Sequence, residues 1–240
     1  MKFGYAEALV ERCPELVAGV IWIEGITNQP TPTEVDEIVA EAERLTLERF
    51  ATPPDIAKHP AIAAWRQVYS RLGVKPNRYP CAAESLIRRV VEAGALPRIS
   101  ALVDLCNAAS LSYAIPVAPF DIANVAGDCI VRFATGSERF LPINAETADV
   151  IPSGEVIYSD DTEDVLSRRW NWRQANKGKV SLETTNLLLT TEAVHESGNS
   201  AVQGVLEELS VRLPEFVGGS VTTAILDRQH LLSERAALTP

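Results

Sequence analysis

The order of two hydrophobic patterns along the chain constrains its fold more than any other feature. In the first half, apolar residues recur at the spacing of an amphipathic helix, as at Val35, Ile38, Val39, Ala42 and Leu45. From about residue 129, short apolar and β-branched segments alternate with turn residues, which is typical of strands. Helical patterns that come first and strand patterns that come mostly later indicate a single α+β domain rather than alternating βαβ units.

The individual elements follow from these patterns and from their end signals. Helices are predicted over residues 34–50, 60–72, 82–93, 99–113 and 202–213, the last ended by Pro214, with a break at 51–55. Strands are predicted over residues 17–23, 129–134, 138–143, 154–159, 165–172 and 220–226. The TGS sequence at 135–137 would join its two flanking strands in a hairpin, and the acidic turn at 160–164 would join the next two. Residues 184–191 fit either a buried strand or a short helix.

Several classes of protein are excluded by composition. No apolar run approaches the roughly 20 residues that span a bilayer, and Glu7 and Glu11 lie where a signal peptide needs an apolar core. The four cysteines are far apart in sequence and form no CxxC pair, which fits buried thiols in a reduced cytoplasmic protein. The three histidines are isolated, and the GxSxG, HExxH and phosphate-loop signatures are missing. We therefore expect no metal and no cofactor.

A basic strip stands out in this acidic chain, whose formal net charge is −10. Its cations, which are the candidate RNA-binding residues, are Arg168, Arg169, Arg173, Lys177 and Lys179. If 165–172 is a strand, alternation places Trp170, Trp172 and Arg168 on one face and Arg169, Asn171 and Arg173 on the other. The two tryptophans of the first face fit either the core, which is the more frequent case, or a platform on which bases stack. The second is either a solvated sheet edge or a surface that lines a pocket or meets phosphates.

A row of polar residues lies inside an apolar helical pattern. Asp104, Asn107 and Ser110 are three residues apart, so they share about one face of the helix predicted over 99–113. Such a row either satisfies buried backbone groups or points into a cavity.

The segment from Pro80 to Asp121 resembles the B3/B4 domain of the phenylalanyl-tRNA synthetase β subunit. The resemblance is carried by LPRIS, LVDL and the asparagine at 107, followed by a proline loop and Phe120-Asp121. The chain looks still more like the free-standing B3/B4 proteins, which lack the rest of the synthetase. Its RRWNWR segment, after a strand and an acidic turn, is similar to what is expected of that branch. The resemblance covers roughly residues 70–215, with 1–70 as an N-terminal part of the same domain and 216–240 as a C-terminal extension.

The resemblance implies a fold and an editing site. The fold is a three-layer α+β domain with a mixed β-sandwich core flanked by helices. In the synthetase this domain hydrolyses the ester of tRNA that carries tyrosine in place of phenylalanine. Asn107 falls on the asparagine that lines the editing pocket, and Asp121 falls on the acidic residue that closes the same motif. The candidate catalytic residues are therefore Asn107, which would orient the ester or water, and Asp121 or Glu163, which would act as the base.

Two departures from the family pattern bear on activity. The synthetase motif has a histidine where this chain has Ala118, and its glycine-rich turn with a glutamate is replaced here by SDDTED at 159–164. Tyrosine specificity is therefore not expected to carry over. Asp121 has a structural alternative, in which it ties down the proline loop. The candidate substrate-binding residues are Asp104, Ser110, Ala118, Tyr158 and Asn171.

Three functions remain open on the sequence. The first is a trans-acting editing factor that hydrolyses mischarged aminoacyl-tRNA and has no ligase activity. The second is a non-catalytic module that binds tRNA or an amino-acid-like ligand in the same pocket, and the third is a protein that keeps only the fold. The expected partner is a tRNA or aminoacyl-tRNA acceptor end, not DNA and not a membrane. The amino acid, the tRNA and the oligomeric state are left open.

Overall fold

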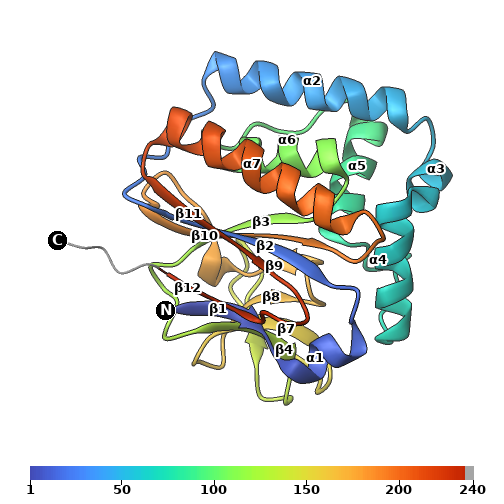
Figure 1. Cartoon of the computed structure of the whole chain (residues 1–240), viewed down its shortest axis with the longest axis vertical. Helices are drawn as coiled ribbons and strands as arrows, with labels where there is room; N and C mark the ends of the chain where they lie inside the picture. The colour runs from blue at the N-terminus through green and yellow to red at the C-terminus, as the bar shows by residue number, and fades with distance from the viewer. Residues whose placement is uncertain (236–240) are drawn as a thin grey trace.

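The computed structural model describes residues 1–235 and contains helices, two main sheets and a two-stranded ribbon (Figure 1). The helices are α1 (Glu7–Arg12), α2 (Thr33–Arg49), α3 (Pro53–Lys58), α4 (Pro60–Arg71), α5 (Ala82–Ala93), α6 (Ala101–Tyr113), α7 (Gly198–Val217) and the 3₁₀ turn η1 (Asn176–Gly178). The first strands are β1 (Lys2–Tyr5), β2 (Val17–Glu24), β3 (Val117–Asp121), β4 (Cys129–Phe133), β5 (Arg139–Phe140) and β6 (Asp149–Val150). The later strands are β7 (Val156–Ser159), β8 (Val165–Arg168), β9 (Arg173–Gln174), β10 (Asn186–Ala193), β11 (Ser220–Leu226) and β12 (Leu232–Glu234).

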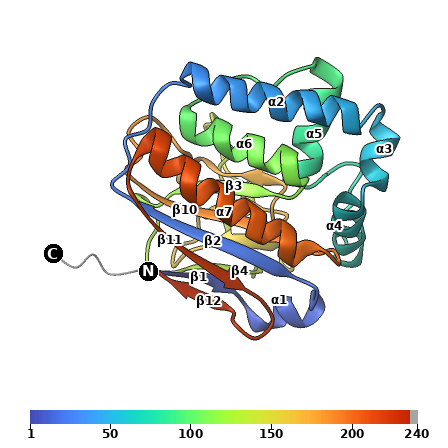
Figure 2. The ribbon, with the colours of Figure 1, turned by 45° about the horizontal axis from the view of Figure 1, so that its top comes forward.

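A four-stranded antiparallel sheet forms the middle of the molecule, in the order β11-β2-β10-β3. Its central strands, β2 and β10, are buried along nearly their whole length. This burial explains why both read as continuous apolar runs, without the alternation of a half-exposed strand. Helices α6 and α7 pack on one face of this sheet, and α2 packs on α6 (Figure 2).

A six-stranded sheet forms the other outer layer, in the order β12-β1-β4-β7-β8-β9. Only the β1–β4 pair is parallel. The two sheets meet through aromatic side chains, since the rings of Phe120 on β3 and Tyr158 on β7 have centroids 5.3 Å apart. Helices, a middle sheet and an outer sheet make three layers, which confirms the predicted α+β fold with a mixed β-sandwich core flanked by helices.

Most predicted elements are present at or near their predicted bounds. α5 ends at Gly94, which has a left-handed φ of 83° and whose N–H bonds to the carbonyl of Val90. α6 begins after Ser100, whose hydroxyl accepts a hydrogen bond from the N–H of Val103. The segment 184–191, for which helix and strand were both open, lies mainly in the buried strand β10.

The break predicted at 51–55 does follow α2, which ends at Arg49, although residues 53–58 then form a short helix with proline in its first turn. Three local predictions are wrong. α7 continues through Pro214 to Val217. Segments 129–134 and 138–143 do not form a hairpin: β4 is paired on both sides, by β1 and β7, so β5 pairs with β6 instead. The strand predicted over 165–172 ends at Arg168, because Arg169 and Trp170 adopt left-handed φ angles of 45° and 61°.

Three further expectations concern the cysteines, membrane-spanning segments and the C-terminal extension. Cys13, Cys81, Cys106 and Cys129 are buried free thiols. Among the helices within residues 1–235, none combines the length and the apolar character needed to cross a bilayer. The C-terminal extension predicted over 216–240 lies in β11 and β12 for much of its length, and its residues 236–240 lie outside the described part of the chain.

Candidate functional site

A cavity of about 480 Å³ lies where the two sheets expose neighbouring edge strands, β3 on one and β9 on the other. α6 contributes Val103 and Asn107, and β3 contributes four consecutive residues, Val117 to Phe120. The wall opposite is built from β7, β8 and β9 and from the turn between β8 and β9. The lining is apolar with a few convergent polar groups, which is the usual character of a small-molecule site.

The buried end of the cavity holds polar groups whose orientation is set by neighbours behind them. The amide of Asn171 donates from Nδ2 to Glu192 Oε2 at 2.9 Å and accepts at Oδ1 from the Tyr69 hydroxyl at 2.8 Å. Because one end of the amide meets an acceptor and the other a donor, only one flip state of Asn171 satisfies both. Tyr158 also lines this end, and burial, followed by the charge of Glu192, raises the pKa of its phenol well above the ordinary value.

Glu192 is a buried carboxylate directly behind this wall. Its Oε1 accepts from the Tyr5 hydroxyl and from Trp170 Nε1, both at 2.7 Å, and its Oε2 accepts from Asn171. These three donors satisfy the carboxylate where water is excluded. They also join β1, β10 and the β8–β9 turn in one hydrogen-bond network, which fixes the position of Asn171.

The polar row on α6 divides between structure and site. Asn107 is half-buried and lines the cavity, and within residues 1–235 its amide has no hydrogen-bond partner. Asp104 instead accepts from the Thr31 hydroxyl at 2.5 Å and from the N–H of Ile99 at 3.1 Å, and burial raises its pKa. The Ser110 hydroxyl donates to the carbonyl of Ile115 at 2.8 Å. Asp104 and Ser110 thus form hydrogen bonds with neighbouring groups and do not line the cavity.

The two predicted carboxylates lie outside the cavity. Asp121 accepts from the N–H of Ala123 at 2.8 Å and from the Thr184 hydroxyl at 2.6 Å, so it ties the loop after β3 to the segment before β10. Glu163 is exposed in the turn after β7, where its backbone carbonyl accepts from the N–H of Arg139. Among the cavity-lining residues of the described chain, there is no carboxylate, imidazole or thiol.

Three further lining residues bear on what the cavity can bind: Ala118, Gln174 and Lys179. Ala118, the position of the family histidine, lines it from β3 and adds only a methyl group. Gln174 donates from Nε2 to the carbonyls of Pro119 and Gly178, both at 2.8 Å, and so joins the two edge strands across the cavity. Lys179 is the only cation of the lining within residues 1–235, and its exposed Nζ lies 3.2 Å from Asn144 Oδ1.

The basic strip does not form one face. Arg168 is buried and forms a bidentate ion pair with Glu155 at 2.9 and 3.0 Å. It also pairs with Asp149 at 3.3 Å. Lys177 pairs with Asp160 at 2.6 Å. Neither is available to RNA in this arrangement. The left-handed turn after β8 breaks the predicted alternation, so it sends Trp170 into the core and leaves Trp172 half-buried at the cavity, near Arg169 and Arg173.

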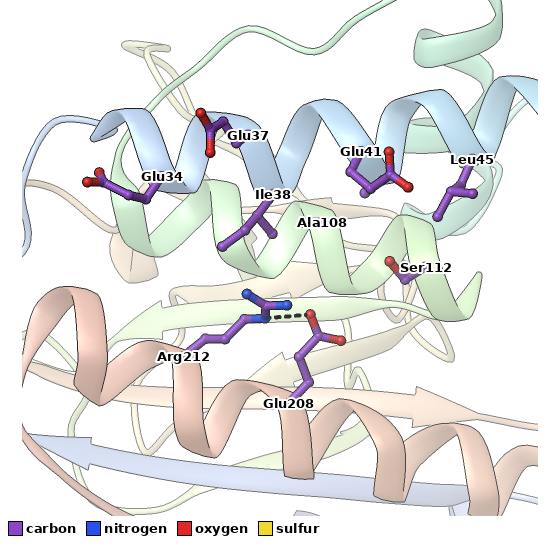
Figure 3. Close-up of a pocket in the computed structure, with 10 residues that line it drawn as sticks. Glu34, Glu37, Ile38, Glu41, Leu45, Ala108, Ser112, Glu208 and Arg212 are labelled. Atoms are coloured by element: carbon purple, nitrogen blue, oxygen red, sulfur yellow. Dashed lines mark hydrogen bonds and ion pairs between the residues drawn. The ribbon is translucent and has the colours of Figure 1, made fainter.

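A second hollow, of about 350 Å³, lies between α2, α6 and α7 (Figure 3). Glutamates 34, 37 and 41 project from α2, and Glu208 pairs with Arg212 on α7 at 3.0 Å. None of the predicted site residues lines it. Within residues 1–235, no group of three or more histidine, cysteine, aspartate or glutamate side chains is placed to hold a metal ion.

Sequence reasoning missed several residues of the site. Tyr69, Ser167, Gln174 and Glu192 were not predicted, and the core was the favoured assignment for Trp172. One signal was present for Glu192, which is the single charged residue in the strand NLLLTTEA. A charge inside a buried strand requires partners and therefore marks a network.

Three comparisons relate the chain to known proteins. The model of the B3/4 domain matches residues 64–230. The phenylalanine–tRNA ligase β subunit of Chromobacterium violaceum is 36% identical over 123 residues, which are 50% of this chain and 16% of that protein. The crystal structure of an N-terminal fragment of the phenylalanyl-tRNA synthetase β subunit from Pyrococcus horikoshii has a TM-score of 0.46 at 13% identity, over 91% of this chain and 49% of that one. The chain thus spans a small part of the curated relative that it matches.

Proposed function

The chain belongs to the B3/4 domain family, and we propose that the cavity between its sheets binds the aminoacyl end of a charged tRNA and hydrolyses the ester in trans. A relative that is named a tRNA ligase subunit supports a tRNA-related role. The observation that carries the proposal is the side-chain amide of Asn107, which has no hydrogen-bond partner within residues 1–235 and lines an otherwise largely apolar cavity. An amide held there without a protein partner is suited to bind the ester or the attacking water.

The reaction needs positioning more than a strong base. A water oxygen attacks the ester carbonyl carbon, the bond from that carbon to the ribose oxygen breaks, and the ribose oxygen takes up a proton. Because an aminoacyl ester is already activated, holding water against it and donating hydrogen bonds to the developing oxyanion supplies much of the acceleration. Asn107 orients the water or donates to the oxyanion. Asp121 and Glu163 have no part in this proposal, since neither lines the cavity.

The test is a panel of correctly and incorrectly charged tRNAs incubated with the full chain. Ester loss above the spontaneous rate is expected for at least one mischarged tRNA, and loss on none of them would exclude the hydrolase. Asn107→Ala should slow hydrolysis roughly 100-fold, as for loss of one oxyanion donor. Asn199→Ala, at an exposed asparagine in the first turn of α7, is the matched control and should leave the rate unchanged.

A second candidate function is binding without hydrolysis. It is favoured by the lack of a carboxylate, imidazole or thiol in the cavity lining of residues 1–235, which leaves no side chain of that kind to act as general base. The same panel distinguishes the two functions. Saturable binding of charged tRNA that is weakened by Asn107→Ala, with the ester stable, would support the binding module over the hydrolase.

A further inference from the structure

We propose that a surface beside the cavity mouth, the aromatic–arginine ladder of Arg78, Tyr79, Arg169, Trp172 and Arg173, binds unpaired nucleotides of an RNA 3′ end. The bases stack on the two rings and the phosphates pair with the guanidinium groups. This inference rests on the proposed function, because it supplies the path by which an RNA strand brings its aminoacyl end to the cavity.

The two rings come from distant parts of the chain. Tyr79 lies in the loop between α4 and α5, and Trp172 lies in the turn between β8 and β9. Their ring centroids are 4.9 Å apart with planes at 77°. Trp172 also lines the cavity, so the pair stands directly beside the candidate site. Both rings are half-buried, which leaves part of each accessible to a base.

Arginines alternate with these rings. The guanidinium carbon of Arg169 lies 3.9 Å from the Tyr79 centroid and 4.8 Å from the Trp172 centroid. Arg78 lies 5.2 Å from the Tyr79 centroid, and Arg173 lies 5.9 Å from the Trp172 centroid. Arg78 and Arg173 are exposed, and neither forms an ion pair within residues 1–235. Planar cations that pack on aromatic faces and keep free N–H donors are suited to phosphate and base together.

The turn that presents the ladder has a strained backbone. Arg169 and Trp170 are consecutive residues with left-handed φ angles, which side chains other than glycine rarely adopt. The turn is held by Glu155 Oε1, which accepts from the N–H of Arg169 at 3.1 Å, and by the Tyr69 hydroxyl, whose single proton is shared between the Arg169 carbonyl at 2.9 Å and Asn171 Oδ1. Strain that persists under such restraints is common at binding sites. Here it directs Trp170 inward and leaves Arg169 and Trp172 in the ladder.

The ladder separates the cavity from a shallow hollow of about 370 Å³. Tyr79, Arg78 and Arg169 line this hollow together with Lys75 and Glu155. Three cations thus line the same hollow as one carboxylate, which bonds to the buried Arg168 and also pairs with Arg169 at 3.7 Å. In a chain of net charge −10, this is a local positive surface, and it adjoins the cavity where Arg169 packs on the cavity-lining Trp172. It is complementary to a phosphate backbone that passes from the hollow over the two rings into the cavity.

The experiment compares two uncharged RNA hairpins with the same duplex, one blunt and one with a short unpaired 3′ overhang. The full chain should bind the overhang hairpin roughly tenfold or more tighter, as expected for one or two stacked bases. Tyr79→Ala and Trp172→Ala should each remove most of that difference and leave blunt-hairpin binding unchanged. Phenylalanine at either position should restore it, which separates stacking from a general loss of folding.

Charge is tested with the double variant Arg78→Gln, Arg173→Gln. The control is Arg228→Gln, at another exposed arginine, after β11, for which the described residues provide no ion pair. The ladder variant should weaken overhang binding and flatten its salt dependence, whereas the control should do neither. Equal binding of the two hairpins, or unchanged binding by the Tyr79 and Trp172 variants, would overturn the inference even if ester hydrolysis is found. Overhang binding without hydrolysis of any charged tRNA would support the ladder and reject the hydrolase. Displacement of the overhang hairpin by an acidic peptide of equal charge would reject RNA as the preferred partner.

Discussion

At the scale of single residues, Glu192 connects the core to the site. It is almost fully buried, no cation pairs with it within residues 1–235, and its three hydrogen bonds come from neutral donors, one on β1 and two in the β8–β9 turn. One of these donors is Asn171, which lines the cavity. A change at Glu192 should therefore affect both stability and the orientation of an amide in the site.

Glu192→Gln replaces one acceptor oxygen by an NH₂ group, which cannot accept from Tyr5, Trp170 or Asn171. A buried donor left without a partner costs about 1–3 kcal/mol, so urea unfolding should show a loss of that size. Binding of charged tRNA should weaken as well, because the side-chain amide of Asn171 is then free to flip. Glu207→Gln, at an exposed position on α7, is the control. Equal stability of the two variants would contradict the network.

At the scale of elements, the conformation of a connecting segment is set by side chains that hydrogen-bond to nearby backbone groups. The segment after β4 bends at Gly136, where Glu138 accepts from the N–H groups of Thr135 at 3.0 Å and Gly136 at 2.9 Å, and from Arg132 at 2.6 Å. Burial by itself would raise the pKa of Glu138, but these hydrogen bonds outweigh burial and lower it to about 2. The TGS sequence predicts that β4 ends here, but not which strand pairs with β4.

This carboxylate should make stability depend on pH in the acid range. The folded pKa is about 2 and the ordinary value is 4.5, so the unfolded chain takes up the proton first as pH falls. The stability that Glu138 contributes is fully present above pH 4.5 and is lost as pH falls through about 2. In urea unfolding, Glu138→Gln should be destabilised by about 1–3 kcal/mol at neutral pH, and its deficit should shrink toward pH 2. A deficit that does not change with pH, or one matched by the exposed-site variant Glu146→Gln, would contradict this assignment.

At the scale of the whole molecule, the two ends of the chain are incorporated into both sheets. β1 lies between β12 and β4, and β2 lies between β11 and β10. The family model begins at residue 64, after both of these strands. Removing them would leave unpaired edges in each sheet and open the core on which Glu192 depends, since Tyr5 comes from β1.

A chain that starts at residue 64 should therefore fail to fold by itself. Circular dichroism and size-exclusion chromatography should show an unfolded or aggregated species, whereas the full chain gives one cooperative transition. Adding residues 1–63 as a separate fragment should restore part of the folded signal. Cooperative unfolding of the shorter chain alone would indicate that residues 64–235 form an independent domain.

The sequence by itself determined the class of the fold and most of its elements, because helical periodicity, apolar runs and caps such as Gly94 are local properties. It also indicated Asn107, Tyr158 and Asn171, which the structure brings to one cavity. Only the tertiary structure decided which polar residues are taken by partners. The partners of Asp104 and Asp121 are distant in sequence, and Arg168 and Lys177 pair with carboxylates that a turn brings close to them. Local spacing in the sequence does not reveal either kind of partner. For the same reason Trp172 and Tyr79 come together only after folding, although the chain separates them by more than 90 residues.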